Sequence, residues 1–141
     1  MADINYKAPQ SPRIWNYWQG GKDNYAVDRA AGDEWIARQP EIVQIAKQSR
    51  QFLIRAVRFL AAEAGIRQFL DIGTGLPTLQ NTHEVAQEVA PESRIVYVDN
   101  DPLVLTHARA LLRNTTDEGV TSYIDADYHN PELIVSDAKA A

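Results

Sequence analysis

The chain has 141 residues, of which 45% are hydrophobic and 23% charged, and its formal net charge is −5. This length and composition predict a globular protein that can bury a core, and they argue against a disordered chain. The acidic balance and the lack of any run of like charges argue against a nucleic-acid partner.

Metal sites, disulfides and membrane spans are also disfavoured. The sequence has no cysteine, which excludes disulfides, thiolate metal sites and a nucleophilic thiol. A histidine metal site is not expected either, because His83, His107 and His129 are not spaced like metal ligands. The N-terminus lacks the apolar core of a signal peptide, and no apolar run is long enough to span a bilayer. We therefore expect a cytoplasmic protein without membrane contact.

The N-terminal part is expected to contain a polar arm and three helices. Residues 1–10 are polar and contain proline, which is typical of a loose arm. The helices are predicted around residues 13–18, over 28–38 and over 41–64. Pro40 separates the last two, and Gly65 suits the C′ position that stops the long helix. Apolar residues of this helix fall roughly on one face: Ile42, Ile45, Phe52, Ala56 and Leu60.

Strands and helices alternate in the rest of the chain. Strands are predicted over residues 68–72, 94–98 and 121–125, with helices that end near residues 89, 113 and 136. Asn81 and Glu84 have the spacing of an N-cap and its N3 partner. Asp101 and Pro102 fit an N-cap residue followed by proline at position N1 of the next helix. The order predicts parallel strands with right-handed crossovers, which is an α/β, Rossmann-like sheet.

Two of the predicted strands end in residues that suit a nucleoside ligand. The first runs into Asp71, Gly73 and Gly75, and the second ends on Asp99, 24 residues after Gly75. Glycine can take a positive φ and lets the backbone approach a ligand closely. A carboxylate at a strand end can accept hydrogen bonds from both hydroxyls of a ribose. These features predict a cofactor that carries adenosine.

The loop after Gly75 differs from that of a dinucleotide site. NAD and FAD sites have a G-x-G-x-x-G motif that opens straight into a helix holding the pyrophosphate. Here Thr78 stands at the third glycine position, Pro77 precedes it, and polar residues continue to Asn81. Asp71 suits a positively charged group, such as the amino group of a methionine moiety, better than a phosphate. An NAD-dependent oxidoreductase is therefore disfavoured.

The chain resembles class I S-adenosylmethionine-dependent methyltransferases in three motifs: Asp71-x-Gly73-x-Gly75, Asp99 and Asp125-Ala126-Asp127. It is also similar to an actinobacterial family of predicted methyltransferases in three longer runs: residues 11–25, 71–78 and 81–87. The resemblance implies a helical lid over residues 1–40 and a partial Rossmann-like domain over 41–141. It also implies S-adenosylmethionine as cofactor and S-adenosylhomocysteine as product, and the acidic surface favours a small-molecule acceptor.

The resemblance places cofactor contacts in both parts of the chain. The loop of residues 20–25 is implied to cover the cofactor, and Asp127 to accept from the adenine amine. The predicted contacts are Tyr17, Lys22, Asn24, Tyr25, Asp71, Gly73, Thr74, Gly75, Asp99, Asn100 and Asp127. Asp101 is interpreted as a helix cap, and no catalytic residue is named.

Several of these residues also have a structural interpretation. Trp15 and Trp18 are interpreted as packing residues that dock the lid. Asp71 could instead cap backbone N–H groups, and Asp127 could form a turn. His83 is interpreted as a helix-start residue rather than a catalytic one. For the function, a non-catalytic module that binds the same cofactor, or a truncated fragment, stays open as an alternative.

The strand over residues 68–72 is predicted to have an open edge. Members of the family are considerably longer than this chain, and their sheet has the strand order 3-2-1-4-5, in which this strand is central. Without a fourth strand its outer edge would present unpaired N–H and C=O groups. We expect this edge to pair with another copy, to be covered by the C-terminal segment, or to belong to a longer protein.

Overall fold

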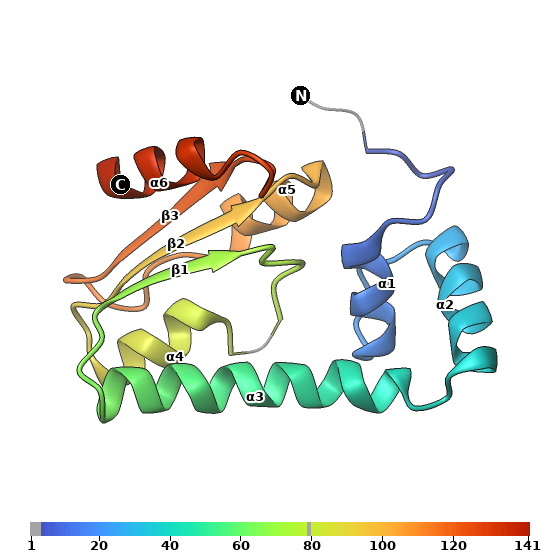
Figure 1. Cartoon of the computed structure of the whole chain (residues 1–141), viewed down its shortest axis with the longest axis horizontal. Coiled ribbons are helices and arrows are strands. Elements are labelled where there is room, and N and C mark those ends of the chain that lie inside the picture. Colours follow the sequence, from blue (N-terminus) through green and yellow to red (C-terminus); the bar gives the residue numbers. More distant parts are fainter. Residues whose placement is uncertain (1–3, 79) are drawn as a thin grey trace. The chain divides into compact units, whose positions relative to one another are not determined.

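The computed structural model describes residues 4–78 and 80–141 (Figure 1). Its elements are, in chain order, α1 Ser11–Trp18, α2 Ala26–Arg38, α3 Ile42–Ala62, β1 Gln68–Ile72, α4 Thr82–Val89, β2 Arg94–Asp99, α5 Pro102–Leu111, β3 Val120–Asp125 and α6 Pro131–Ala140. Each predicted helix and strand is present, with ends that differ by a few residues. The chain divides into two compact units, Met1–Phe52 and Leu53–Ala141, and each is described by itself.

The second unit is built on a parallel sheet of three strands in the order β1-β2-β3 (Figure 1). The register places Asp71 opposite Tyr97 and Asp99 opposite Asp125. The carboxyl ends of the strands therefore lie at the same edge of the sheet. This is the predicted α/β, Rossmann-like arrangement, with the strands in the expected order.

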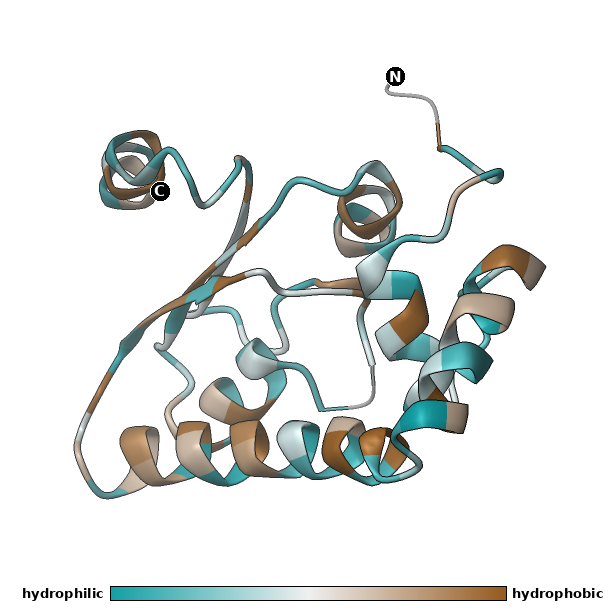
Figure 2. Cartoon of the chain, turned by 45° about the vertical axis from the view of Figure 1, so that its right-hand side comes forward, coloured by the Kyte–Doolittle hydropathy of each residue, from teal (hydrophilic) through white to brown (hydrophobic). Residues whose placement is uncertain are grey.

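Apolar side chains pack on both faces of this sheet, and Figure 2 shows hydrophobic segments in the strands and in the helices beside them. One face packs against α4, α5 and the second half of α3, with a buried cluster of Ile54, Val57, Val85, Ala86, Ile95, Tyr97, Ala108 and Leu112. The other face packs against α6, with a buried cluster of Val98, Ile124, Ala126 and Ile134. Burial of each larger apolar side chain contributes about 1.5–3 kcal/mol.

In the part of the chain that the structure describes, β1 pairs only with β2, so its other edge is open. Two of its apolar side chains, Leu70 and Ile72, are 43% and 50% exposed. The C-terminal segment forms α6 beside β3, so one of the three alternatives, that this segment covers the open edge of β1, is wrong. A helix satisfies its own backbone hydrogen bonds and cannot pair with a strand edge.

The buried face of α3 is not the one on which the sequence places its apolar residues. Three of those residues, Ile45, Phe52 and Leu60, are 44%, 65% and 37% exposed. The buried residues of this helix are instead Ala46, Ile54, Val57 and Ala61. Apolar residues surround much of α3, so periodicity alone fits more than one face. Packing against neighbouring elements decides which face is buried.

The first unit is organised around a buried ion pair between α1 and α2. The Arg13 Nε lies 3.0 Å from Asp28 Oδ2, and both side chains are almost fully buried. Arg13 also donates to the carbonyls of Asn5 and Ala8, at 2.9 and 2.6 Å. Asp28 accepts from the N–H of Gln10 at 3.0 Å. The segment from Asn5 to Gln10 is therefore held in place, which corrects the expectation of a loose arm.

Trp18 also joins α1 to α2. It is buried, and its Nε1 donates to the carbonyl of Gly32 at 3.3 Å. A Cβ at Gly32 would lie 2.8 Å from the Tyr17 ring, so glycine allows this close approach. Within this unit Trp18 packs α1 against α2, and its predicted role in docking the lid on the core stays a prediction. No helix among residues 4–78 and 80–141 combines the length and apolar character needed to cross a membrane.

Candidate functional site

The loop after β1 contains two glycines in the left-handed region. Gly73 has φ +72° and Gly75 has φ +71°, and a Cβ built on either would have no atom within 4 Å. The N–H groups of Gly73 and Thr74 donate to the carbonyl of Val98 in β2, at 2.8 and 3.2 Å. Thr74 Oγ1 lies 3.1 Å from the carbonyl of Asp71. The turn is thus anchored to the sheet, while its glycines leave open space for a ligand to approach.

Asp99, the last residue of β2, holds this loop and the start of the next one. Its Oδ2 accepts from the N–H of Gly75 at 2.9 Å. Its Oδ1 accepts from the N–H groups of Asn100 and Asp101, at 2.8 and 3.0 Å. A carboxylate offers about four acceptor positions, so Oδ2 keeps the capacity to accept from a ligand hydroxyl. Asp101 caps α5 by accepting from the N–H groups of Leu103 and Val104, as predicted.

Asp127, after β3, is joined to the β2 end through a side-chain hydrogen bond. Asn100 Nδ2 donates to its Oδ2 at 3.2 Å. The backbone N–H and the ring Nδ1 of His129 lie 2.9 and 2.6 Å from its Oδ1. These bonds from His129 hold the pKa of the Asp127 carboxyl below its ordinary value. The predicted turn-forming role of Asp127 is therefore present, and the carboxylate lies at the same edge as Asp99.

Asp71 lies in β1 itself, and its carboxylate is tied to the start of α4. Thr82 Oγ1 donates to Asp71 Oδ2 at 2.8 Å. The next residue, His83, is buried, and its backbone N–H donates to Tyr97 Oη at 2.8 Å. The His83 ring Nδ1 also lies 2.8 Å from Tyr97 Oη. Burial holds the pKa of His83 below its ordinary value. His83 thus has the features of a paired helix-start residue.

The four predicted contacts of the first unit lie around α1 and the start of α2. Tyr17 Oη donates to Asp33 Oδ1 at 2.7 Å, and this bond raises the pKa of Tyr17. Asn24 Nδ2 donates to Asn16 Oδ1 at 2.9 Å. Lys22 is exposed.

Tyr25 is the N-cap residue of α2, and its N–H donates to Asp28 Oδ2 at 2.9 Å. The Arg13 guanidinium lies 5.0 Å from the centre of the Tyr25 ring. Burial raises the pKa of Tyr25. These residues form an ordered group within their own unit. That they share one site with the strand-end residues of the second unit stays a prediction.

Sequence reasoning missed two side chains that hold the predicted carboxylates, namely Thr82 and His129. Thr82 follows the capping residue Asn81 directly, so a hydroxyl at the first position of a helix was a usable signal. His129 stands two residues after Asp127, which is the spacing of an Asx-type turn. Both contacts depend on chain geometry that only the folded loops define.

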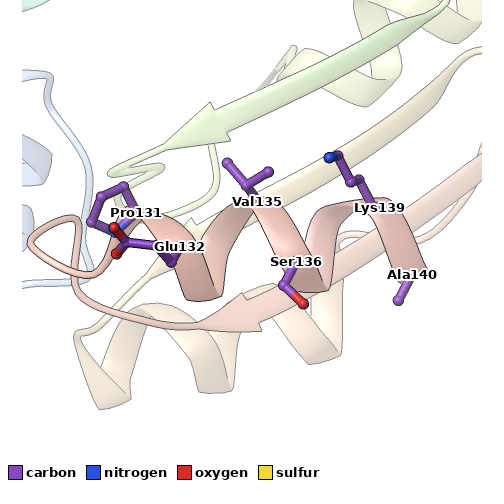
Figure 3. A pocket seen from close by; sticks show the side chains of 6 residues that line it. All are labelled: Pro131, Glu132, Val135, Ser136, Lys139 and Ala140. Carbon is purple, nitrogen blue, oxygen red and sulfur yellow. The ribbon is translucent and has the colours of Figure 1, made fainter.

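Figure 3 shows the side chains that line a surface hollow along α6. It is lined by Pro131, Glu132, Val135, Ser136, Lys139 and Ala140. All six residues come from one helix, and none of them is a predicted cofactor contact. No group of three or more acidic, histidine or cysteine side chains that could hold a metal ion is present within the described ranges.

A family model described as S-adenosyl methyltransferase matches residues 1–141 of the chain. The chain belongs to this family. Its structure is similar to a crystal structure of a DUF574 family protein from Streptomyces avermitilis, with 51% sequence identity and a TM-score of 0.91 over 95% of this chain. It is also similar to a structure from Thermobifida fusca, whose protein is described as a candidate methyltransferase. That match has 47% identity and a TM-score of 0.88 over 96% of this chain.

This member of the S-adenosyl methyltransferase family spans about half the length of the solved structures that it matches, because each match covers 51% of the other chain. No curated protein matches the chain. The family and the fold expected from the sequence motifs are both confirmed by these comparisons. The matched residues of this chain include the glycine loop, the strand-end carboxylates and the N-terminal helices.

Proposed function

We propose that this chain forms the adenosine-binding part of an S-adenosylmethionine-dependent methyltransferase. The observation that carries the proposal is the hydrogen-bonded series Gly75–Asp99–Asn100–Asp127, which joins all three strand ends at the carboxyl edge of the sheet. Ligands of open α/β sheets bind in the crevice outside this edge. Membership of the S-adenosyl methyltransferase family supports this choice of ligand.

Each carboxylate of the edge suits a different portion of the cofactor. Asp99 Oδ2, with one protein donor described, would accept from the ribose hydroxyls. Asp127 would accept from the adenine amine, with Asn100 and His129 orienting it. Asp71 would meet the positively charged amino group of the methionine portion. The open space beside Gly73 and Gly75 lets the ligand lie close to the backbone.

The loop of residues 20–25 is proposed to close over the same cofactor. Tyr17, Lys22, Asn24 and Tyr25 supply a phenol, an ammonium, an amide and a second phenol as polar contacts. Asn24 and Tyr25 are held by hydrogen bonds to Asn16 and Asp28, so the loop does not have to be ordered from a disordered state. Less conformational entropy would then be lost on binding.

When bound, S-adenosylmethionine supplies a methyl group on an already activated sulfonium, so a methyltransferase mainly aligns the acceptor for in-line attack. The residues described here bind and orient the cofactor. We propose a small-molecule acceptor because the chain is acidic and would repel nucleic acid. The alternative is a non-catalytic module that binds the same nucleosides. Transfer of a labelled methyl group to candidate acceptors separates the two.

The test is isothermal titration of the purified chain with S-adenosylhomocysteine. The unmodified chain should show saturable binding, and Asp99→Ala should weaken it about 10- to 150-fold, as expected for the loss of a hydrogen bond to a charged group. Asp117→Ala is the matched control, because Asp117 is an exposed carboxylate in the loop before β3, at the opposite end of that strand. It should bind normally. Absence of binding by the folded, unmodified chain, or equal effects of both substitutions, would contradict the proposal.

A further inference from the structure

The start of α4 is attached to two neighbouring strands by consecutive residues. Thr82 donates to Asp71 in β1, and His83 pairs with Tyr97 in β2. Asp71 and Tyr97 are direct neighbours in the β1–β2 register. The first turn of the helix therefore lies over one pair of adjacent strand residues and is hydrogen-bonded to both strands.

Buried contacts fix the position of Thr82. Thr82 and His83 are 4% and 2% exposed, and Tyr97 is 2% exposed. Asn81, just before them, forms a capping box with Glu84, and its Nδ2 donates to the carbonyl of Thr78 at 2.6 Å. A hydroxyl held this firmly presents its proton to Asp71 Oδ2 in one direction. Because the helix start cannot shift without breaking buried hydrogen bonds, the carboxylate is held as well.

We propose that Thr82 is a positioning residue that orients the Asp71 carboxylate toward a ligand ammonium group. Its hydroxyl occupies one acceptor position of Oδ2 and restricts rotation of the side chain. A carboxylate offers about four acceptor positions, so it can accept from Thr82 and from a ligand group at the same time. His83 and Tyr97 act one step further away, by holding the backbone that carries Thr82. This inference rests on the proposed binding of S-adenosylmethionine, in which Asp71 meets the amino group of the ligand.

The test compares Thr82→Val, which removes the hydroxyl at nearly constant shape, with Thr82→Ser, which restores it. Two ligands are titrated: S-adenosylhomocysteine, and 5′-methylthioadenosine, which lacks the amino acid portion. Thr82→Val should bind S-adenosylhomocysteine about tenfold more weakly, as expected for one lost hydrogen bond that positions a charge. Its affinity for 5′-methylthioadenosine should not change. Thr82→Ser should recover most of the loss, whereas a merely structural role would weaken both ligands alike.

A second measurement does not need a ligand. The χ1 rotamer of Asp71, obtained from three-bond NMR couplings, should be single in the unmodified chain and averaged in Thr82→Val. Thr106→Val is the matched control, because the Thr106 hydroxyl bonds the carbonyl of Pro102 on the surface of α5. It should leave both the rotamer and the affinities unchanged.

The outcomes separate the two proposals. If the unmodified chain binds neither nucleoside, the proposed function fails for this chain, and the rotamer measurement alone decides the role of Thr82. If the unmodified chain binds both and Thr82→Val keeps the ligand preference, the role of Thr82 is refuted and the proposed function stands. An averaged Asp71 rotamer in the unmodified chain also refutes the positioning role.

Discussion

Replacing Tyr97 with phenylalanine tests the buried hydrogen bonds that hold the start of α4. Tyr97 Oη contacts both the backbone N–H and the ring Nδ1 of His83, each at 2.8 Å. The aromatic ring, stacked on Tyr123 with a centroid distance of 6.0 Å, would stay in place. The N–H of His83 is in the first turn of a helix and has no intrahelical acceptor. Losing its partner in a buried site costs about 1–3 kcal/mol.

The net loss of the second contact adds about 1 kcal/mol, so Tyr97→Phe should lower the free energy of unfolding by about 2–4 kcal/mol. Urea unfolding followed by far-UV circular dichroism measures this change, and native-state hydrogen exchange at the start of α4 shows whether it is local. We expect faster amide exchange there.

Tyr123→Phe is the matched control for this prediction. Tyr123 lies beside Tyr97, and burial raises its pKa to about 12. Its hydroxyl has no hydrogen-bond partner in the described structure. Removing an unsatisfied buried hydroxyl should be neutral or slightly stabilising. The reasoning is refuted if Tyr97→Phe lies within about 0.5 kcal/mol of the unmodified chain, which is the range of ordinary surface substitutions, or if both variants lose equal stability.

Three further outcomes are expected. Arg13→Met removes the cation from the buried Asp28 carboxylate and should destabilise the first unit by about 3–5 kcal/mol. Tryptophan fluorescence reports on this unit, because all three tryptophans lie in it. An unchanged urea midpoint would contradict this prediction. Burial lowers the pKa of His83 below its ordinary value of 6.5, so the unfolded chain takes up this proton first. Stability should therefore fall as the pH drops below 6.5, and His83→Asn should reduce that slope in urea unfolding. The open edge of β1 should pair with a second copy of the chain at high concentration. This prediction is contradicted if light scattering shows only monomers and the β1 amides exchange as fast as loop amides.

Local sequence signals were sufficient for most elements of the second unit. Asn81 with Glu84 and Asp101 with Pro102 mark helix starts that the structure places at these residues. Gly65 stops α3 with a φ of +70°. These signals act between residues that are close in the sequence, so they do not depend on the rest of the fold. The same is true of the positive φ at Gly73 and Gly75, which the motif predicts.

Periodicity and composition failed where contacts between distant residues decide the outcome. The apolar face noted in the sequence of α3 is not the buried one, because apolar residues lie on several sides of this helix. The arm before α1 was expected to be loose because it is polar, yet Arg13 holds the carbonyls of Asn5 and Ala8. Cover of the open β1 edge by the C-terminal segment was one of three alternatives, but the helix of this segment packs beside β3. Each outcome depends on which surfaces meet after folding.

For the site, the sequence alone determined the chemical groups and their order along the chain: two glycines, then Asp99, then Asp127, each at the end of a predicted strand. Tertiary structure decided how these groups are held. The bonds from Thr82 to Asp71 and from Asn100 to Asp127 join residues 11 and 27 positions apart. No local pattern encodes such pairs, because their geometry arises only when parallel strands place their carboxyl ends at one edge of the sheet.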